Sequence, residues 1–215
     1  MRIPVGPNRN SWNAALLSAG LVCAGVVGVG ARTMFRYENT AGIPAAPPSR
    51  WPAHTKIIPR HGVFTLVLFA HPDCPCTRAT LEQLNRLLSR ASDALSAVVE
   101  FRKPGVSLAE VQKSSLWKQA SSIPGLSVAL DNDGLETREF RASVSGQTML
   151  YDATGKLVFS GGITAARGHA GDNPASGAVL LHIAGRAAAT QAPVFGCSLL
   201  DPDQDELAQS PSWKR

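Results

Sequence analysis

Few residues of this chain are charged, and fewer still are aromatic. Charged side chains make up 17% of the 215 residues and aromatic ones 6%, against 44% hydrophobic residues. A coiled coil would carry more charge, and a disordered polyampholyte would not carry this much apolar mass. The chain is therefore long enough and apolar enough to form one packed domain together with additional segments outside it.

Cysteine is also scarce, and the positive charge is unevenly placed. Four cysteines are too few for a fold built on disulfides. The formal net charge is +5, but residues 1–39 hold four Arg and one Glu, which leaves seventeen basic against fifteen acidic residues in the rest of the chain. No run of Lys and Arg interleaved with aromatic residues occurs, so we expect no nucleic-acid partner.

The longest uncharged segment runs over residues 12–31. It is bracketed by Arg9 and Arg32 and matches the thickness of a bilayer core, so it predicts one transmembrane helix behind a short tail, residues 1–11. Arg32 and Arg36 follow the segment and favour an uncleaved membrane anchor over a cleaved signal sequence. The short tail favours a cytoplasmic N-terminus, which would place the C-terminal domain of this single-pass protein on the periplasmic side.

Proline content and hydrophobic periodicity divide the remainder of the chain. Residues 32–60 contain five prolines and predict an extended linker, followed by a domain over 61–200 and a solvated acidic tail over 201–215. The predicted strands are 63–70, 95–101, 126–130, 148–152 and 156–160, and the predicted helices are 77–91, 107–120, 136–141 and 178–189. A buried βαβ unit followed by a hairpin and a helix indicates an α/β sandwich with a mixed central sheet.

The motif that carries chemistry is HPDCPC, residues 71–76, which lies where a buried strand ends and a helix begins. Unpaired backbone N–H groups and the positive end of the helix favour thiolate over thiol at this junction. A disulfide between Cys74 and Cys76 would close a tight ring across Pro75, so this pair suits exchange better than structural bridging. Cys197, near the C-terminus, is a further thiol that could resolve a mixed disulfide.

The sequence resembles the thioredoxin-like superfamily, and more narrowly the membrane-anchored RedB-type proteins. The resemblance is carried by YENT, FAHPDCPCTRA, LYDATGKLVFSGGITAARGHAGDN and PVFGC, at residues 37–40, 69–79, 150–173 and 193–197. It implies a thioredoxin-like fold and, from the broader superfamily, thiol–disulfide exchange, peroxide reduction or copper delivery outside the cytoplasm. Two features depart from the superfamily: the cysteines are spaced CxC, and Gly146 stands where a cis-proline is usual.

Three hypotheses about function follow. The first is a membrane-tethered thiol–disulfide oxidoreductase that needs no cofactor, acts on a cysteine-containing protein partner, and uses Cys74, Cys76 and Cys197 as its reacting thiols. The second is binding of Cu(I) or zinc by His71 and these three cysteines. His169 is an outside candidate from the glycine-rich loop over residues 163–177, which is too long for a simple connection, and such loops are more often functional or disordered than neutral. The missing cis-proline favours the second hypothesis, because in the superfamily this proline helps to keep metal away from the cysteines. The third is a thioredoxin-like interaction module without catalysis.

Overall fold

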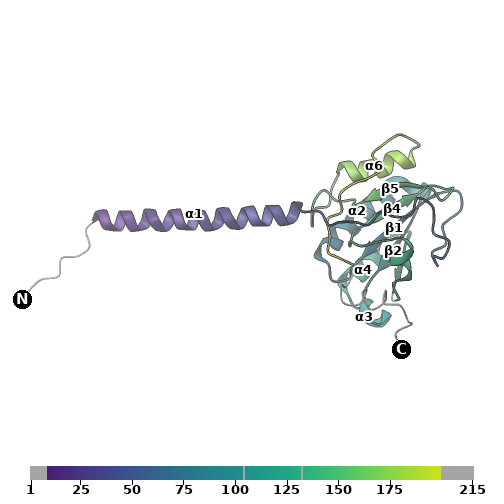
Figure 1. Ribbon diagram of the computed structural model, residues 1–215, viewed down its shortest axis with the longest axis horizontal. Helices are drawn as coiled ribbons and strands as arrows, with labels where there is room; N and C mark the ends of the chain where they lie inside the picture. Colours follow the sequence, from purple (N-terminus) through teal and green to yellow (C-terminus); the bar gives the residue numbers. More distant parts are fainter. Residues whose placement is uncertain (1–8, 104, 132, 200–215) are drawn as a thin grey trace, which may run out of the picture. The chain divides into compact units, whose positions relative to one another are not determined.

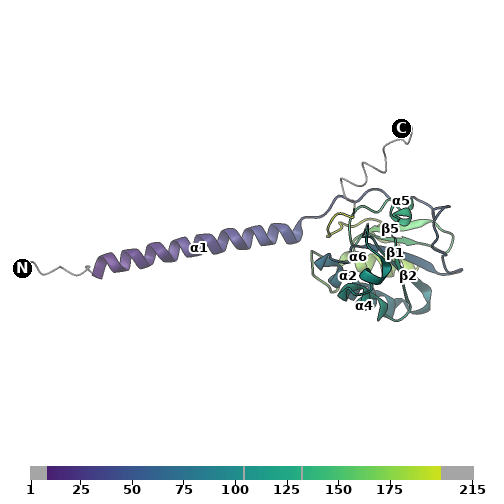
Figure 2. The same ribbon diagram turned by 90° about the horizontal axis from the view of Figure 1, so that it is seen from below.

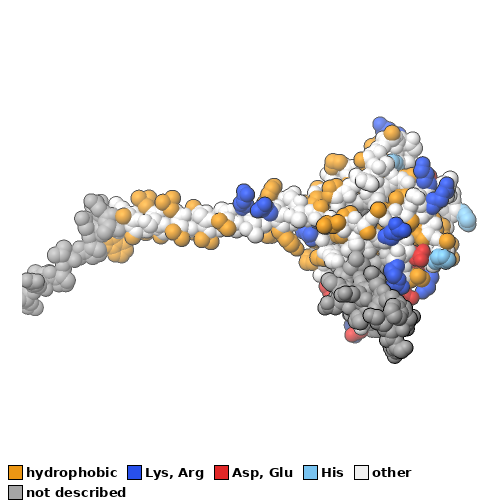
Figure 3. All heavy atoms as spheres, viewed as in Figure 1, with side chains coloured by type: hydrophobic (Ala, Val, Ile, Leu, Met, Phe, Trp, Pro, Cys, Tyr) orange, Lys and Arg blue, Asp and Glu red, His pale blue; other side chains and the backbone are white. Residues whose placement is uncertain are grey.

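The computed structural model describes residues 9–103, 105–131 and 133–199, and it divides the chain into two compact units after Asn39. The first unit is helix α1, Arg9–Asn39 (Figure 1). From Trp12 onward α1 is long and apolar enough to cross a membrane, and it continues beyond residue 31, where the predicted span ends. Its large hydrophobic side chains are all exposed, and hydrophobic side chains follow its visible face in Figure 3. The predicted acidic tail, 201–215, lies outside the described residues.

The second unit is built on a five-stranded mixed sheet. Its strands are β1 Phe64–Ala70, β2 Leu95–Phe101, β3 Leu126–Leu130, β4 Thr148–Tyr151 and β5 Leu157–Gly161, in the order β3-β2-β1-β4-β5. Strands β1, β2 and β3 run parallel to one another, whereas β4 is antiparallel to both β1 and β5. The predicted βαβ unit and the predicted hairpin are therefore confirmed.

Helices lie on both faces of this sheet (Figure 2). They are α2 Pro75–Ala91, α3 Leu108–Val111, α4 Ser115–Ser121, α5 Leu135–Glu139 and α6 Pro174–Ile183, with a 3-10 turn, η1, at Ser92–Ala94. On one face α2 packs against both α4 and α6, and α5 lies on the other face. A mixed sheet between helices is the predicted α/β sandwich.

Strand β1 is buried on both faces, as its continuous apolar sequence predicts. Because side chains alternate along a strand, Leu66 and Leu68 belong to the core cluster that includes the leucines of α2. Val67 and Phe69 belong to the other cluster, which lies on the opposite face and includes Tyr151. This central position holds the end of β1, and the cysteine motif that follows it, in the middle of the domain.

The helix predicted over 107–120 is two helices in the structure, α3 and α4. Ser114 is extended, with φ −63° and ψ 147°, and its hydroxyl accepts a hydrogen bond from Trp117 N at 3.1 Å. A serine in this conformation starts a new helix instead of continuing the old one.

The helix predicted over 178–189 begins and ends earlier than expected. The side chain of Asn173 accepts a hydrogen bond from Ser176 N, and Pro174 occupies the first turn, where a missing N–H costs nothing. The helix ends at Ile183, and Gly185 adopts a left-handed conformation shortly after it. The predicted glycine-rich loop is correspondingly shorter.

The predicted linker over 32–60 is not a free spacer. Its first residues continue α1 as far as Asn39, and the remainder packs within the second unit. The ring of Trp51 contacts Phe140 and Tyr151 edge-on, with centroid distances of 5.3 and 5.1 Å. Leu157 N donates to Ser49 O at 2.9 Å and Trp51 N donates to Gly155 O at 2.8 Å, so the segment pairs with the sheet through one isolated bridge, Arg50 with Lys156. The prolines on either side limit this pairing, and burial of the apolar side chains against the open face stabilises the segment. The domain therefore begins directly after α1.

Candidate active site

The cysteine motif forms the loop between β1 and α2 and the first turn of α2. Within it, Cys74 N donates a hydrogen bond to His71 O at 3.2 Å, and Thr77 N donates to Cys74 O at 3.0 Å. The hydroxyl of Thr77 also donates to His71 O at 3.2 Å. These bonds hold Cys74 at the N-terminus of α2, where free N–H groups stabilise a thiolate.

A second loop, which precedes β4, lies against this motif. Gly146 N donates to Phe69 O at 2.7 Å, so the loop is held to the end of β1. The hydroxyl of the buried Ser145 accepts a hydrogen bond from His71 N at 3.0 Å and lies 3.1 Å from the hydroxyl of Thr77. The glycine that replaces the superfamily's cis-proline therefore lies beside the cysteine motif.

The C-terminal segment brings Cys197 to the same place. Ser145 N donates to Cys197 O at 2.8 Å, and Leu199 N donates to Ser143 O at 2.9 Å, so the segment runs alongside the loop before β4. Gly196 permits this approach, because a Cβ on it would lie 1.7 Å from Ser145 O. Any larger residue at this position would require the backbone to move.

The thiols of Cys74 and Cys197 face each other, with their Sγ atoms 3.0 Å apart. Cys74 is 2% exposed, and burial alone would raise its pKa. Hydrogen bonds from the side chain and backbone of Cys197, from the backbone of Cys76 and from the hydroxyl of Ser145 outweigh burial and lower the pKa of Cys74 below its ordinary value. Of the three thiols at this site, Cys74 ionises most readily.

The other two thiols remain protonated at neutral pH. Burial, followed by the hydrogen bond and negative charge of Cys74, raises the pKa of Cys197 to about 12. Burial and the charge of Cys74 also raise the pKa of Cys76, although a hydrogen bond and the positive charge of Arg167 oppose this shift. The arrangement is that of one nucleophile beside a protonated thiol.

Cys74 also lines a cavity of about 450 Å³ between the starts of α2 and α4, together with Asp73, Arg78 and Leu116. Asp73, on its rim, accepts a hydrogen bond from Lys103 Nζ at 2.5 Å. Burial and the charge of Lys103 lower the pKa of His71 against the opposing effect of Asp73, so that imidazole is neutral at pH 7. The cavity therefore borders Cys74, although the residue itself is almost fully buried.

The predicted metal ligands are only partly brought together. Within the described residues, no group of three or more His, Cys, Asp or Glu side chains is arranged to hold a metal ion. His71 Nδ1 accepts a hydrogen bond from Asp73 N at 3.1 Å, and the exposed His169 has its Nδ1 2.8 Å from Arg167 O in its own loop. Of the predicted ligands, the structure places Cys74 and Cys197 with their sulfur atoms next to each other. Metal binding by this set stays a prediction.

Sequence analysis did not single out Ser145, Lys103 or Arg167. The available signal for Ser145 was its neighbour Gly146, which sequence analysis had noted at the usual cis-proline position before the hairpin. Arg167 lies in the glycine-rich loop, whose length indicated a functional segment. No local pattern marks Lys103, which reaches Asp73 only because β2 pairs with β1.

No family model and no curated protein matches this chain. Solved structures do match it. A hypothetical protein from Sinorhizobium meliloti is 22% identical with a TM-score of 0.55, and the match covers 74% of this chain and 93% of that one. An uncharacterized conserved protein from Geobacillus kaustophilus is 17% identical with a TM-score of 0.54, covering 77% and 95%. The exposed lipoprotein thioredoxin Etrx1 from Streptococcus pneumoniae is 21% identical with a TM-score of 0.42, covering 58% and 85%.

At these identities the likeness concerns the fold alone. The parallel β1-α2-β2 unit, the antiparallel β4-β5 hairpin and the closing helix α6 form a thioredoxin-like sandwich. The domain therefore has a thioredoxin-like fold, and an apolar helix that could span a membrane precedes it in the chain.

Proposed function

We propose that this chain is a membrane-anchored, extracytoplasmic thiol–disulfide exchange protein of the RedB type, with Cys74 as the attacking thiol and Cys197 as the resolving thiol. The observation that carries the proposal is the 3.0 Å separation of their Sγ atoms. The lowered pKa of Cys74 and its position on the cavity support the order of attack. No required cofactor enters this chemistry.

In the first step, the Cys74 thiolate attacks one sulfur of a disulfide in a protein partner. A bond forms between Cys74 Sγ and that sulfur as the partner's S–S bond breaks, and the partner's second sulfur leaves as a thiolate. The hydrogen bonds to Cys74 favour its thiolate form before attack. We place the partner's disulfide in the cavity that Cys74 lines.

In the second step, Cys197 resolves the mixed disulfide. Cys74 is now neutral, so its charge and its hydrogen bond no longer raise the pKa of Cys197. Burial and the charge of Cys76 still raise this pKa, and the charge of Arg167 lowers it. Cys197 gives its proton to solvent and attacks Cys74 Sγ, which releases the partner's remaining sulfur as a thiolate. The two electrons of the dithiol reduce the partner's disulfide, and Cys74 and Cys197 end as a disulfide. The reverse sequence oxidises a partner dithiol.

Helix α1 supports the membrane anchor in this proposal. An orientation with the N-terminus in the cytoplasm would place Cys74, Cys76 and Cys197 on the periplasmic side. Protein disulfides form and persist in that compartment, whereas the cytosol keeps thiols reduced. Thiol–disulfide exchange is therefore consistent with the proposed location.

The test uses the full chain in detergent micelles, equilibrated with glutathione redox buffers and mapped by mass spectrometry. We expect a Cys74–Cys197 disulfide that forms in the parent and in Cys76→Ser. Cys197→Ser should accumulate a mixed disulfide between Cys74 and a disulfide-containing peptide. Cys74→Ser should slow exchange by at least about 100-fold, because the only readily ionised thiol of the site is gone.

Three outcomes would contradict this assignment. A Cys74–Cys76 disulfide as the oxidised form, or exchange that survives Cys197→Ser, would exclude Cys197 as the resolving thiol. Stoichiometric Cu(I) uptake that is lost in Cys74→Ser, without any exchange activity in the parent, would favour the metal-binding hypothesis instead.

A further inference from the structure

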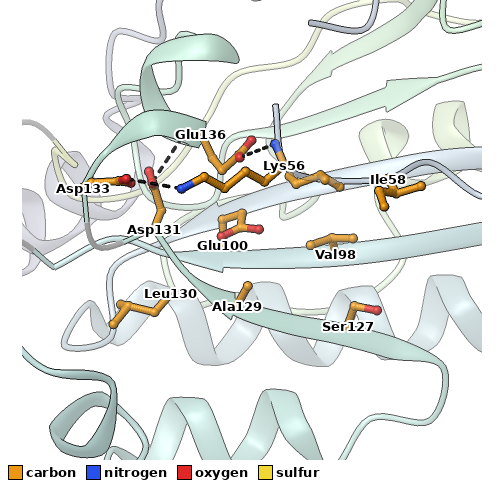
Figure 4. Close-up of a pocket in the computed structure, with 11 residues that line it drawn as sticks. Lys56, Ile58, Val98, Glu100, Ser127, Ala129, Leu130, Asp131, Asp133 and Glu136 are labelled. Atoms are coloured by element: carbon orange, nitrogen blue, oxygen red, sulfur yellow. Dashed lines mark hydrogen bonds and ion pairs between the residues drawn. The ribbon is translucent and has the colours of Figure 1, made fainter. Parts of the chain in front are cut away.

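A second cavity, of about 320 Å³, lies over β2 and β3 (Figure 4). Val98 and Glu100 of β2 line it, and they pair in register with Val67 and Phe69 of β1. The cavity therefore opens on the sheet face that carries the second core cluster, opposite to α2. It is separate from the cavity beside Cys74.

The two ends of this cavity differ in chemistry. In Figure 4, Val98 and Ile58 lie toward one end, Asp131 and Asp133 toward the other, and Glu100 lies between them. Val98 of β2 and Ala129 and Leu130 of β3 form the apolar part of the wall, and Ser127 of β3 adds one hydroxyl to it. A ligand that fills the cavity would meet apolar surface at one end and carboxylates at the other.

Glu100 is the unusual member of the acidic set. It is 4% exposed, and no described residue donates a hydrogen bond to its carboxylate or pairs with it as an ion. Its neighbours are satisfied: Asp131 accepts hydrogen bonds from the backbone N–H groups of Glu136 and Thr137, and Glu136 accepts one from Lys56 N. A buried carboxylate without a donor points to a partner that the protein does not itself supply.

The charges around Glu100 favour a cation. Burial, followed by the negative charges of Glu136 and Asp131, raises the pKa of Glu100 to about 8. The remaining charged groups at the cavity are Lys56 and Asp133, which pair with each other at 3.4 Å and are both mostly exposed. Beside the cavity, Arg102 and Arg138 donate to the backbone carbonyls of Asp131 and Asp133 at 3.3 and 2.9 Å. The acidic end therefore carries four carboxylates against these two guanidinium groups and the rim lysine.

We propose that this cavity binds an aliphatic ammonium group, with the ammonium against Glu100 and the alkyl chain along Val98 and Ala129. An ammonium supplies the hydrogen-bond donors that Glu100 lacks, and its methylene chain suits the apolar wall. The described residues form no cluster of three or more metal-ligating side chains, so an organic cation fits better than a metal ion. The proposal does not depend on the thiol chemistry.

Binding of the cation is linked to a proton. Near pH 7 Glu100 is mostly protonated, and an ammonium beside it stabilises the carboxylate, so binding releases a proton. Aliphatic amines keep their charge up to about pH 10. Affinity should therefore rise between pH 6 and pH 8.

The experiment titrates the full chain in micelles with n-pentylammonium and follows methyl resonances of Ala129 and Val98 by NMR. We expect saturable shifts at both methyl groups, and none with 1-pentanol, a matched neutral probe. Glu100→Gln, which preserves shape but removes the charge, should weaken binding by at least about ten-fold. A parallel titration with Nα-acetyl-lysine methylamide distinguishes a protein lysine from a free amine, because tighter binding of this probe indicates the lysine source.

A second measurement on the unmodified protein keeps the test independent of that variant. The carboxyl carbon resonance of Glu100 should report a pKa at least about one unit lower when the amine is present. The proposal is overturned if the methyl shifts do not saturate, if 1-pentanol reproduces them, if Glu100→Gln binds equally well, or if the pKa of Glu100 does not move.

Discussion

Cys74 and Glu100 are both acids that are buried against the same sheet, and their pKa values move in opposite directions. Burial raises the pKa of each. At Cys74, hydrogen bonds from two backbone groups and from the side chains of Cys197 and Ser145 reverse that effect. At Glu100 no described residue donates, and two carboxylates add to the effect of burial. The donors around a buried acid therefore decide its charge, and only the thiol site is organised to hold an anion.

The largest effect is expected for Gly196→Ala, which should disrupt the thiol site. The added Cβ would collide with Ser145 O, so the segment that holds Cys197 must move. We expect the free energy of unfolding to fall by roughly 3 kcal/mol. The pKa of Cys74 should then rise toward its ordinary value, because Cys197 no longer donates to it.

Chemical denaturation in micelles measures the stability change. Gly177→Ala in α6 is the matched control, because nothing lies within 4 Å of its added Cβ, and its effect should stay below about 1 kcal/mol. Equal stability of the two variants would show that the close approach at Gly196 does not exist in solution.

Glu100→Gln tests the carboxylate site of this comparison through the pH dependence of stability. The pKa of Glu100 is about 8 in the folded protein and 4.5 in the unfolded chain. Between pH 4.5 and pH 8 the folded protein therefore holds a proton that the unfolded chain has lost. The stability of the parent therefore falls as pH rises from 4.5 to 8, and glutamine removes this dependence.

At pH 9 the variant should be more stable than the parent by roughly 2 to 4 kcal/mol, measured by denaturation at a series of pH values. Glu82→Gln, at an exposed position of α2 that pairs with Arg86, is the control and should leave the pH dependence unchanged. Parallel stability curves for the parent and Glu100→Gln would mean that Glu100 is not held in an unfavourable environment.

Ser145→Ala should produce the smallest of these effects. It removes one donor from the Cys74 thiolate and should raise the pKa of Cys74. The pH dependence of iodoacetamide alkylation, resolved for each cysteine by mass spectrometry, measures the change. Ser115→Ala is the control. Ser115 lines the cavity beside Cys74 but makes no hydrogen bond to the Cys74 sulfur, so the pH midpoint for alkylation of Cys74 should match that of the parent. An unchanged midpoint in Ser145→Ala would show that the Ser145 hydroxyl does not stabilise the Cys74 thiolate.

Local sequence patterns predicted much of the fold. The apolar run at 63–70, the leucine spacing over 77–91 and the turn between the hairpin strands all match elements of the structure. They failed at 107–120, where a serine hydroxyl competes with the helix, and at the proline-rich segment, whose packing depends on distant aromatic rings. Short-range periodicity contains no information about such contacts.

The sequence by itself determined the apolar N-terminal helix, the strand–helix junction and the presence of thiols at that junction, because each depends on residues close together in the chain. Only the tertiary structure decided which thiol lies beside Cys74. Cys197 is 123 residues away along the chain, and it arrives through hydrogen bonds to the loop before β4 and through the absence of a side chain at Gly196. The same holds for Glu100, whose carboxylate neighbours converge only when β2, β3 and α5 pack together. Charge and reactivity at both places follow from contacts between distant segments, which local propensity does not specify.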